Sequence, residues 1–178
     1  MKPILLSGIA FCLLLSAGTA AQSAKELFAK ARAELGARNL EAAVAAYRQA
    51  ESASVTQKGK SDAANGAGNV LMKMRRYTDA IAELSRATDL NPANRVAWNN
   101  LGCAHLKMYE YGLSGTTSLD SAYYAFSKVA ELDPNYKAGN LALVKETKDR
   151  EGAWTAAAIT RAEQPARTVA ASGSPKSY

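Results

Sequence analysis

The sequence predicts an all-α fold, a right-handed α-solenoid of three helix pairs closed by a C-terminal capping helix. The prediction rests first on an internal repeat, because the 34 residues from Ser61 to Asn94 match the stretch from Arg95 to Tyr136 in their order of small and large residues. The two stretches also end almost identically, in Ala-Thr-Asp-Leu-Asn-Pro and Val-Ala-Glu-Leu-Asp-Pro. Alanine-rich composition with five prolines favours helices, and nothing in the chain alternates as a strand does.

The spacing of residues within the repeats identifies the kind of helix pair. The third copy contains Trp98, Leu101, Gly102 and His105, followed by Ala122, Phe126 and Pro134. The second copy has, at matching offsets, Ala64, Ala67, Gly68 and Leu71, followed by Tyr77, Ala80, Leu84 and Pro92. This ordering and the 34-residue period resemble the tetratricopeptide repeat. The resemblance implies three repeats, at about 24–57, 61–94 and 95–136, of which the first is the weakest.

Small residues are predicted to lie where the two helices of a pair cross. Gly68 and Gly102 have no side chain to hold the backbones apart, and Ala31 takes this position in the first copy. On the second helices, three alanines are predicted to lie at the crossings for the same reason, namely Ala43, Ala80 and Ala122. Proline lacks an N–H donor and clashes with the preceding turn, so Pro92 and Pro134 are expected to stop the second helices.

We expect the first pair to consist of helices at Ser23–Leu35 and Leu40–Ser52. Ser61 and Asp62 are predicted to cap the second pair, after the three residues Lys58–Lys60. The third pair has eight extra residues between its helices, within Met108–Leu119, and these should bulge outward. Two interpretations stay open, a loop that carries binding and an insertion that is merely tolerated.

Residues 137–162 are predicted to form the capping helix. Leu143 and Val144 fall where the packing residues of a fourth repeat would lie, but no alanine and proline follow to complete that repeat. Gly152 is a candidate break in the helix. Trp154 either packs into the core or anchors a partner.

The first 21 residues are predicted to be a cleavable signal peptide. Lys2 is the only charge, an apolar run extends from Ile4 to Leu15, and small residues at Thr19 and Ala21 suit cleavage before Gln22. The run is shorter than the roughly 20 residues of a membrane span, although a retained anchor is the alternative. The folded domain is then expected at residues 22–162, with a disordered tail at 163–178, and the product in the periplasm or secreted.

No motif of a catalytic, metal or cofactor site is visible in the sequence, so it predicts a protein that is not an enzyme. The formal net charge of +6 comes without the clustered basic stripe that nucleic-acid binding requires. The only histidine, His105, falls in a packing position and is predicted to be structural. Removal of the signal peptide takes Cys12 with it and leaves Cys103 without a disulfide partner in the chain.

The family resemblance implies a groove along the first helices of the pairs. Its predicted lining is Phe28, Arg32, Asn65, Gly66, Asn69, Met72, Lys73, Val96, Asn99, Asn100, Cys103, Leu106 and Lys107. Asparagine donates and accepts at once, which suits the main chain of an extended peptide, although solvated surface residues are the alternative for Asn99 and Asn100.

Some members of the family hold a C-terminal carboxylate with two asparagines and several cations. Asn69 and Asn100 match the asparagine positions, but Asn65, Ala138 and Ala142 stand where the cations should be. The resemblance therefore does not support that specialised function in this chain.

These observations predict a non-enzymatic adaptor of the cell envelope that binds a protein or peptide segment in its groove. The alternative is a structural envelope component that self-associates, or contacts wall polymer or membrane, through the C-terminal helix and basic tail. A third, weaker interpretation is an accessory domain of a secretion or outer-membrane assembly machine. None of these interpretations involves nucleic acid, a metal or a cofactor.

Overall fold

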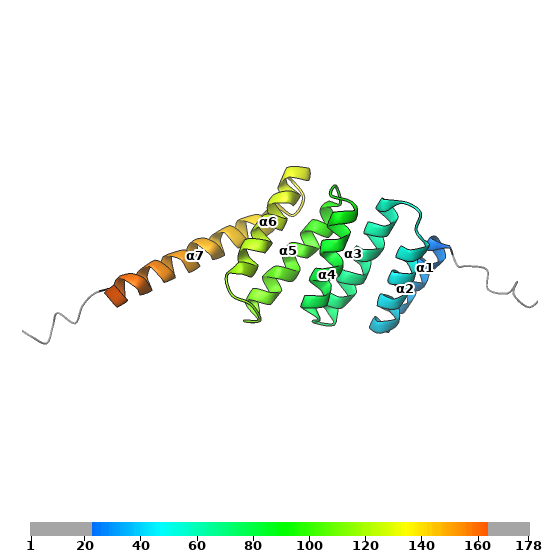
Figure 1. Cartoon of the computed structure of the whole chain (residues 1–178), viewed down its shortest axis with the longest axis horizontal. Coiled ribbons are helices and arrows are strands. Elements are labelled where there is room, and N and C mark those ends of the chain that lie inside the picture. Colours follow the sequence, from blue (N-terminus) through cyan, green and yellow to red (C-terminus); the bar gives the residue numbers. More distant parts are fainter. Residues whose placement is uncertain (1–22, 164–178) are drawn as a thin grey trace, which may run out of the picture.

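The computed structural model describes residues 23–163 and confirms the all-α prediction, since this part of the chain forms seven helices and no strand (Figure 1). The helices are α1 (Ala24–Gly36), α2 (Leu40–Ala53), α3 (Gln57–Lys73), α4 (Tyr77–Leu90), α5 (Arg95–Glu110), α6 (Thr117–Leu132) and α7 (Ala138–Glu163). The predicted signal peptide, and the predicted tail beyond its first residue, lie outside the described residues. Between residues 23 and 163, no helix has the length and apolarity that crossing a membrane would require.

The helices stack in chain order, each packing on the next, and α3 also touches α1 and α5. This pattern of contacts is that of a solenoid of three antiparallel helix pairs with α7 at its end (Figure 1). The main core is one cluster of small alanines and larger side chains, among them Tyr47, Val70, Leu71 and Leu84. A stacked architecture of this kind buries its apolar surface between neighbouring pairs.

The predicted helix crossings are confirmed by the space around the two glycines. A Cβ atom on Gly68 would lie 2.6 Å from Cγ of Leu84, and one on Gly102 would lie 2.6 Å from the ring of Phe126. The alanines at the other crossing positions are fully buried, namely Ala31, Ala43, Ala80 and Ala122. The side chains of Leu84 and Phe126 lie so close to the two glycines that no side chain fits at either position without displacing them.

The start of the second pair differs from the prediction. α3 begins at Gln57, and the hydroxyl oxygen of Thr56 caps it by accepting from the N–H of Gly59 at 3.0 Å. Ser61 is instead buried within the helix, where its hydroxyl donates to the carbonyl of Ala87 at 2.7 Å. The predicted cap at Ser61 and Asp62 is therefore wrong, because α3 begins one turn earlier and Ser61 bonds across to α4.

The insertion of the third pair is only partly a bulge. By repeat position, α5 continues about one turn further than α3 does and ends at Glu110. The connection between α5 and α6 is residues 111–116, whereas the connection between α3 and α4 is residues 74–76. The ring of Tyr111 stacks on that of Tyr77 with centroids 5.5 Å apart, and the guanidinium of Arg75 lies 4.5 Å from the Tyr111 centroid. The insertion thus lengthens the helices and folds back onto the turn of the second pair.

The capping helix α7 is continuous through Gly152, so the candidate break does not occur. Its fully buried Val144 packs with Ala122 and Phe126, and α6 is the helix that α7 contacts most. The C-terminal part of α7 extends past the stack (Figure 1). The side chain of Trp154 lies outside the described residues, so the two interpretations of that residue remain open.

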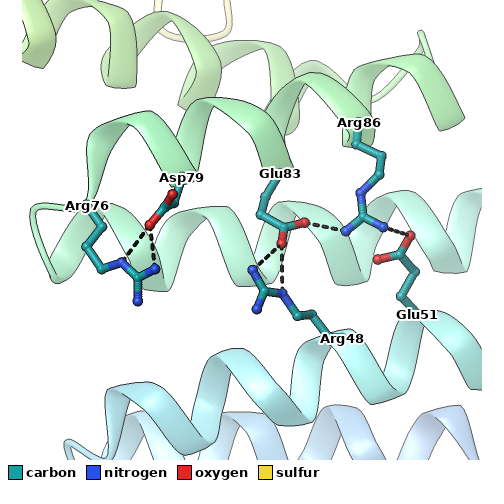
Figure 2. A network of polar contacts seen from close by, with 6 residues as sticks. All are labelled: Arg48, Glu51, Arg76, Asp79, Glu83 and Arg86. Atoms are coloured by element: carbon teal, nitrogen blue, oxygen red, sulfur yellow. Dashed lines mark hydrogen bonds and ion pairs between the residues drawn. The ribbon is translucent and has the colours of Figure 1, made fainter.

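A network of ion pairs joins the second helices of the first two repeats (Figure 2). The buried carboxylate of Glu83 accepts from Arg48 at 2.8 Å and also bonds Arg86 of its own helix. Arg86 in turn reaches Glu51 of α2 at 2.6 Å. Because Glu83 is bonded on both sides, its burial leaves no uncompensated charge, and the network fixes α4 against α2.

Candidate functional site

The candidate site is a hollow of about 1010 Å³ that extends across α1, α3 and the start of α5, and we call it the groove. Six residues of the predicted lining border it, namely Phe28, Arg32, Asn65, Gly66, Asn69 and Val96. The structure adds residues that the repeat pattern did not indicate, among them Lys25, Tyr47, Val55 and Asp62. Val55 belongs to the α2–α3 connection, where the repeat period carries no signal.

Two aromatic rings form the apolar floor of the groove. The rings of Phe28 on α1 and Tyr47 on α2 meet edge to face, with centroids 6.0 Å apart. Tyr47 in turn lies against Gly66, where a Cβ atom would stand 2.5 Å from the ring. Gly66 therefore lets an aromatic side chain from the first repeat reach under α3, which the sequence did not reveal.

Apolar side chains also stand exposed at the rim of the groove. Val55 is 96% exposed and Val96 is 39% exposed, although both border the same hollow. Burial of exposed apolar area is favourable at roughly 25 cal/mol per Å². The groove therefore offers apolar contact both at its floor and at its rim.

The groove is lined by two basic side chains and one acidic side chain, and only the acidic one is bonded to other residues of the protein. Lys25 and Arg32 on α1 are exposed, whereas Asp62 on α3 accepts from Lys58 at 2.7 Å and from the amide of Asn94 at 3.3 Å. The acid is thus already bonded, and the two cations of α1 face the hollow.

Four asparagine side chains form a chain of hydrogen bonds across three helices. The amide of Asn140 on α7 donates to Asn99 at 2.8 Å, and the amide of Asn100 on α5 donates to Asn65 on α3 at 2.9 Å. A longer contact of 3.5 Å joins Asn99 to Asn100. Asn99 is only 7% exposed, so it is a bonded interior residue rather than a solvated one. Asn69 stays exposed at the groove.

The remaining residues of the predicted lining lie outside the hollow, namely Met72, Lys73, Asn99, Asn100, Cys103, Leu106 and Lys107. Met72 packs against the main core, and Cys103 and Leu106 pack with the cluster that holds Val144 of α7. The amine of Lys107 bonds Glu110 at 2.5 Å. Asn99, Cys103 and Leu106 thus lie against α7 or its cluster and Met72 lies against the core, whereas Lys73 is exposed outside the hollow.

The titratable groups of α5 do not form a reactive pair. Burial raises the pKa of the Cys103 thiol, which keeps it protonated and weakly nucleophilic, and burial lowers the pKa of His105. Within residues 23–163, no three His, Cys, Asp or Glu side chains come together in a way that would hold a metal ion. These groups are therefore best explained by packing.

The geometry defines the class of protein first. Antiparallel helix pairs that cross at small residues and stack in chain order are the architecture of an α-solenoid of helical repeats. A family model described as TPR repeat matches residues 68–108, which include the crossing glycines of both strong repeats. Residues 68–108 therefore match the tetratricopeptide repeat, and the described chain has the architecture of a tetratricopeptide-repeat solenoid.

Solved structures agree with this fold. The TPR domain of Sgt2 from Aspergillus fumigatus is 21% identical, with a TM-score of 0.60 over 84% of this chain and 90% of that one. The first TPR of Spaghetti (RPAP3), bound to the HSP90 peptide SRMEEVD, is 16% identical, with a TM-score of 0.62 over 74% of this chain and 99% of that one. The TPR2B domain of yeast Sti1, in complex with pHsp70, is 19% identical, with a TM-score of 0.56 over 72% and 97%. No curated protein matches the sequence.

Proposed function

We propose that the protein is a non-enzymatic adaptor that binds a segment of a partner protein in the groove. The observation that carries this proposal is the open hollow with the Phe28–Tyr47 floor, bordered by valines that are exposed without a partner. Tetratricopeptide-repeat domains commonly mediate protein–protein interaction, and the Spaghetti and Sti1 structures are complexes with HSP90 and Hsp70 peptides. The common fold supports a peptide ligand but not those particular partners.

The dimensions of the groove suit an extended segment. α1 has 13 residues and rises about 1.5 Å per residue, so a segment that lies along α1 has a path of roughly 20 Å. An extended chain advances about 3.3 Å per residue, so about six residues would fill it. The exposed amide of Asn69 and the remaining hydrogens of Asn65 would bond the main chain of such a segment.

Immobilised protein exposed to an envelope extract, with two matched double variants, tests the proposal. Val55→Asp with Val96→Asp places charges at the rim of the groove, and both positions are exposed, so the fold should survive. Leu113→Asp with Leu132→Asp adds the same charge at exposed positions elsewhere, 59% and 43% exposed. We expect the first pair to lose a partner that the second pair retains, with unchanged circular dichroism in both.

A third variant distinguishes the rival function. Deletion of residues 164–178 should leave capture intact if the groove binds the partner. Capture that survives Val55→Asp with Val96→Asp but disappears with the deletion would contradict the proposal. That result would favour self-association or envelope contact through the C-terminal helix and tail.

We further propose that the protein acts in the cell envelope after export. The support lies in the sequence alone, in Lys2, the apolar run from Ile4 to Leu15, and the small residues Thr19 and Ala21. Mass spectrometry of the protein from its native cells should give an N-terminus near Gln22. Recovery of an intact Met1 form from the membrane fraction would overturn this part of the proposal.

A further inference from the structure

Three side chains of α1 give the groove its electrostatic character. Lys25, Phe28 and Arg32 lie at helical spacings of three and four, so they share one face of α1, and all three border the groove. With a rise of about 1.5 Å per residue, the two cations are roughly 10 Å apart along the helix, with the aromatic ring between them.

No carboxylate of the described chain neutralises these two cations. The ion pairs within residues 23–163 include neither Lys25 nor Arg32. The one acid in the lining, Asp62, is already bonded to Lys58 and Asn94. A ligand in the groove would therefore meet two cations available for pairing and one carboxylate already satisfied.

Apolar side chains of the groove lie between Lys25 and Arg32 and on the other elements that line it. Phe28 separates the cations on α1, and exposed Val55 and Val96 face the hollow from the α2–α3 connection and from α5. In an extended segment that runs along α1, positions three apart lie about 10 Å from each other, which is the separation of the two cations along the helix. Charge and spacing thus indicate the same kind of ligand.

We propose that the groove selects an extended segment that carries two acidic residues about three positions apart, with apolar residues between them. This inference rests on the proposed function and adds the chemistry of the partner. The acidic residues pair with Lys25 and Arg32, and the apolar ones contact Phe28 and the two valines. A chain has only one terminal carboxylate, so a segment that pairs with both cations supplies at least one side-chain carboxylate.

Fluorescence anisotropy with the purified protein tests this inference. The probes are end-blocked, fluorescein-labelled ten-residue peptides in which two glutamates flank two leucines within a Gly-Ser frame, and the same peptide with glutamines or lysines for the glutamates. Exposed ion pairs contribute modestly, so we expect the glutamate probe to bind about fivefold more tightly than the glutamine probe. The advantage should shrink at high salt, and the lysine probe should bind worst.

Charge reversal in the protein gives the matched control. Lys25→Glu with Arg32→Glu should remove the preference for glutamate or invert it. Lys30→Glu with Lys145→Glu changes the net charge equally at exposed positions outside the groove lining and should leave the preference intact. An equal loss with both double variants would overturn the inference, because it would reflect net charge alone.

The remaining outcomes separate this inference from the proposed function. Equal affinity for the glutamate and glutamine probes would overturn the acidic preference, and so would a lack of binding to all three probes. In either case the capture experiment with the Val55 and Val96 variants still decides whether the groove binds a partner. If the Val55 and Val96 double variant captured the same proteins as the Leu113 and Leu132 double variant, the proposed function itself would be overturned.

Discussion

At the N-terminal end of the stack, the face of α3 that carries Asn65 and Asn69 borders the open groove, whereas the matching face of α5 is covered by α7. Asn65 and Asn99 occupy the same repeat position, yet Asn65 lines the hollow and Asn99 is 7% exposed and bonded to Asn140. Asn69 is exposed, and its counterpart Cys103 packs in the cluster of Val144. The repeat position fixes which face of a helix a residue occupies, and the next helix decides whether that face remains open.

The largest effect is expected at the helix crossings. Substitution of the crossing glycines tests whether the α3–α4 and α5–α6 pairs have the same crossing geometry, although one borders the open groove and the other is covered by α7. Gly68→Leu and Gly102→Leu should each lower the free energy of unfolding by about 3 kcal/mol, because even a Cβ atom would overlap Leu84 or Phe126. Gly139→Leu is the matched control, since nothing lies within 4 Å of its Cβ position. Urea unfolding measures all three. A neutral result at only one crossing would show that the hairpins differ at their centres.

A second variant tests whether α7 closes the C-terminal end. Val144→Ala removes two methyl groups from a fully buried position and should cost about 2 kcal/mol of unfolding free energy. Because Cys103 packs in the same cluster, its thiol should react faster with a thiol reagent in this variant. The neighbouring Leu143 is 48% exposed, so Leu143→Ala should change neither quantity. An unchanged thiol rate in Val144→Ala would mean that α7 does not shield α5.

Two asparagine variants compare the polar positions of the two ends directly. Asn140→Ala leaves the buried carbonyl oxygen of Asn99 without its donor, which should cost about 1–2 kcal/mol. Asn69→Ala at the exposed groove position should change stability by less than about 0.5 kcal/mol. An equal loss of unfolding free energy in Asn140→Ala and Asn69→Ala would contradict the view that one end of the stack is closed and the other open. Urea unfolding of both variants is the measurement.

The repeat period predicted the fold because close backbone crossings restrict sequence strongly. Gly68 and Gly102 tolerate no side chain, and the alanines opposite them tolerate little more. Such positions leave a pattern that can be read without a structure. The same pattern placed the ends of the second helices, since α4 ends at Leu90 and α6 at Leu132, two residues before Pro92 and Pro134.

The site was less predictable, because its lining depends on contacts between repeats. Nothing in the period indicates that Tyr47 lies under Gly66, or that Val55 of a connection stands at the rim. Likewise, Cys103 and Leu106 occupy groove positions by period, but α7 covers them through Val144 and Leu141. The start of α3 was misplaced for a similar reason, since Ser61 resembles a cap until its bond to Ala87 on α4 is seen.

The smallest expected effect uses the single histidine of the chain as a local probe of the C-terminal half. Burial lowers the pKa of His105 on α5, so the unfolded state binds a proton more readily as the pH falls from the ordinary value of about 6.5. Stability should therefore decrease below that pH, and His105→Gln should remove this part of the decrease in urea unfolding between pH 7.5 and 5.5. Hydrogen exchange at pH 5.5 should show the loss in α5 and α6 rather than in α1 and α2, which contain no histidine. A uniform loss along the stack, or an unaltered profile in His105→Gln, would contradict a titration confined to the closed end.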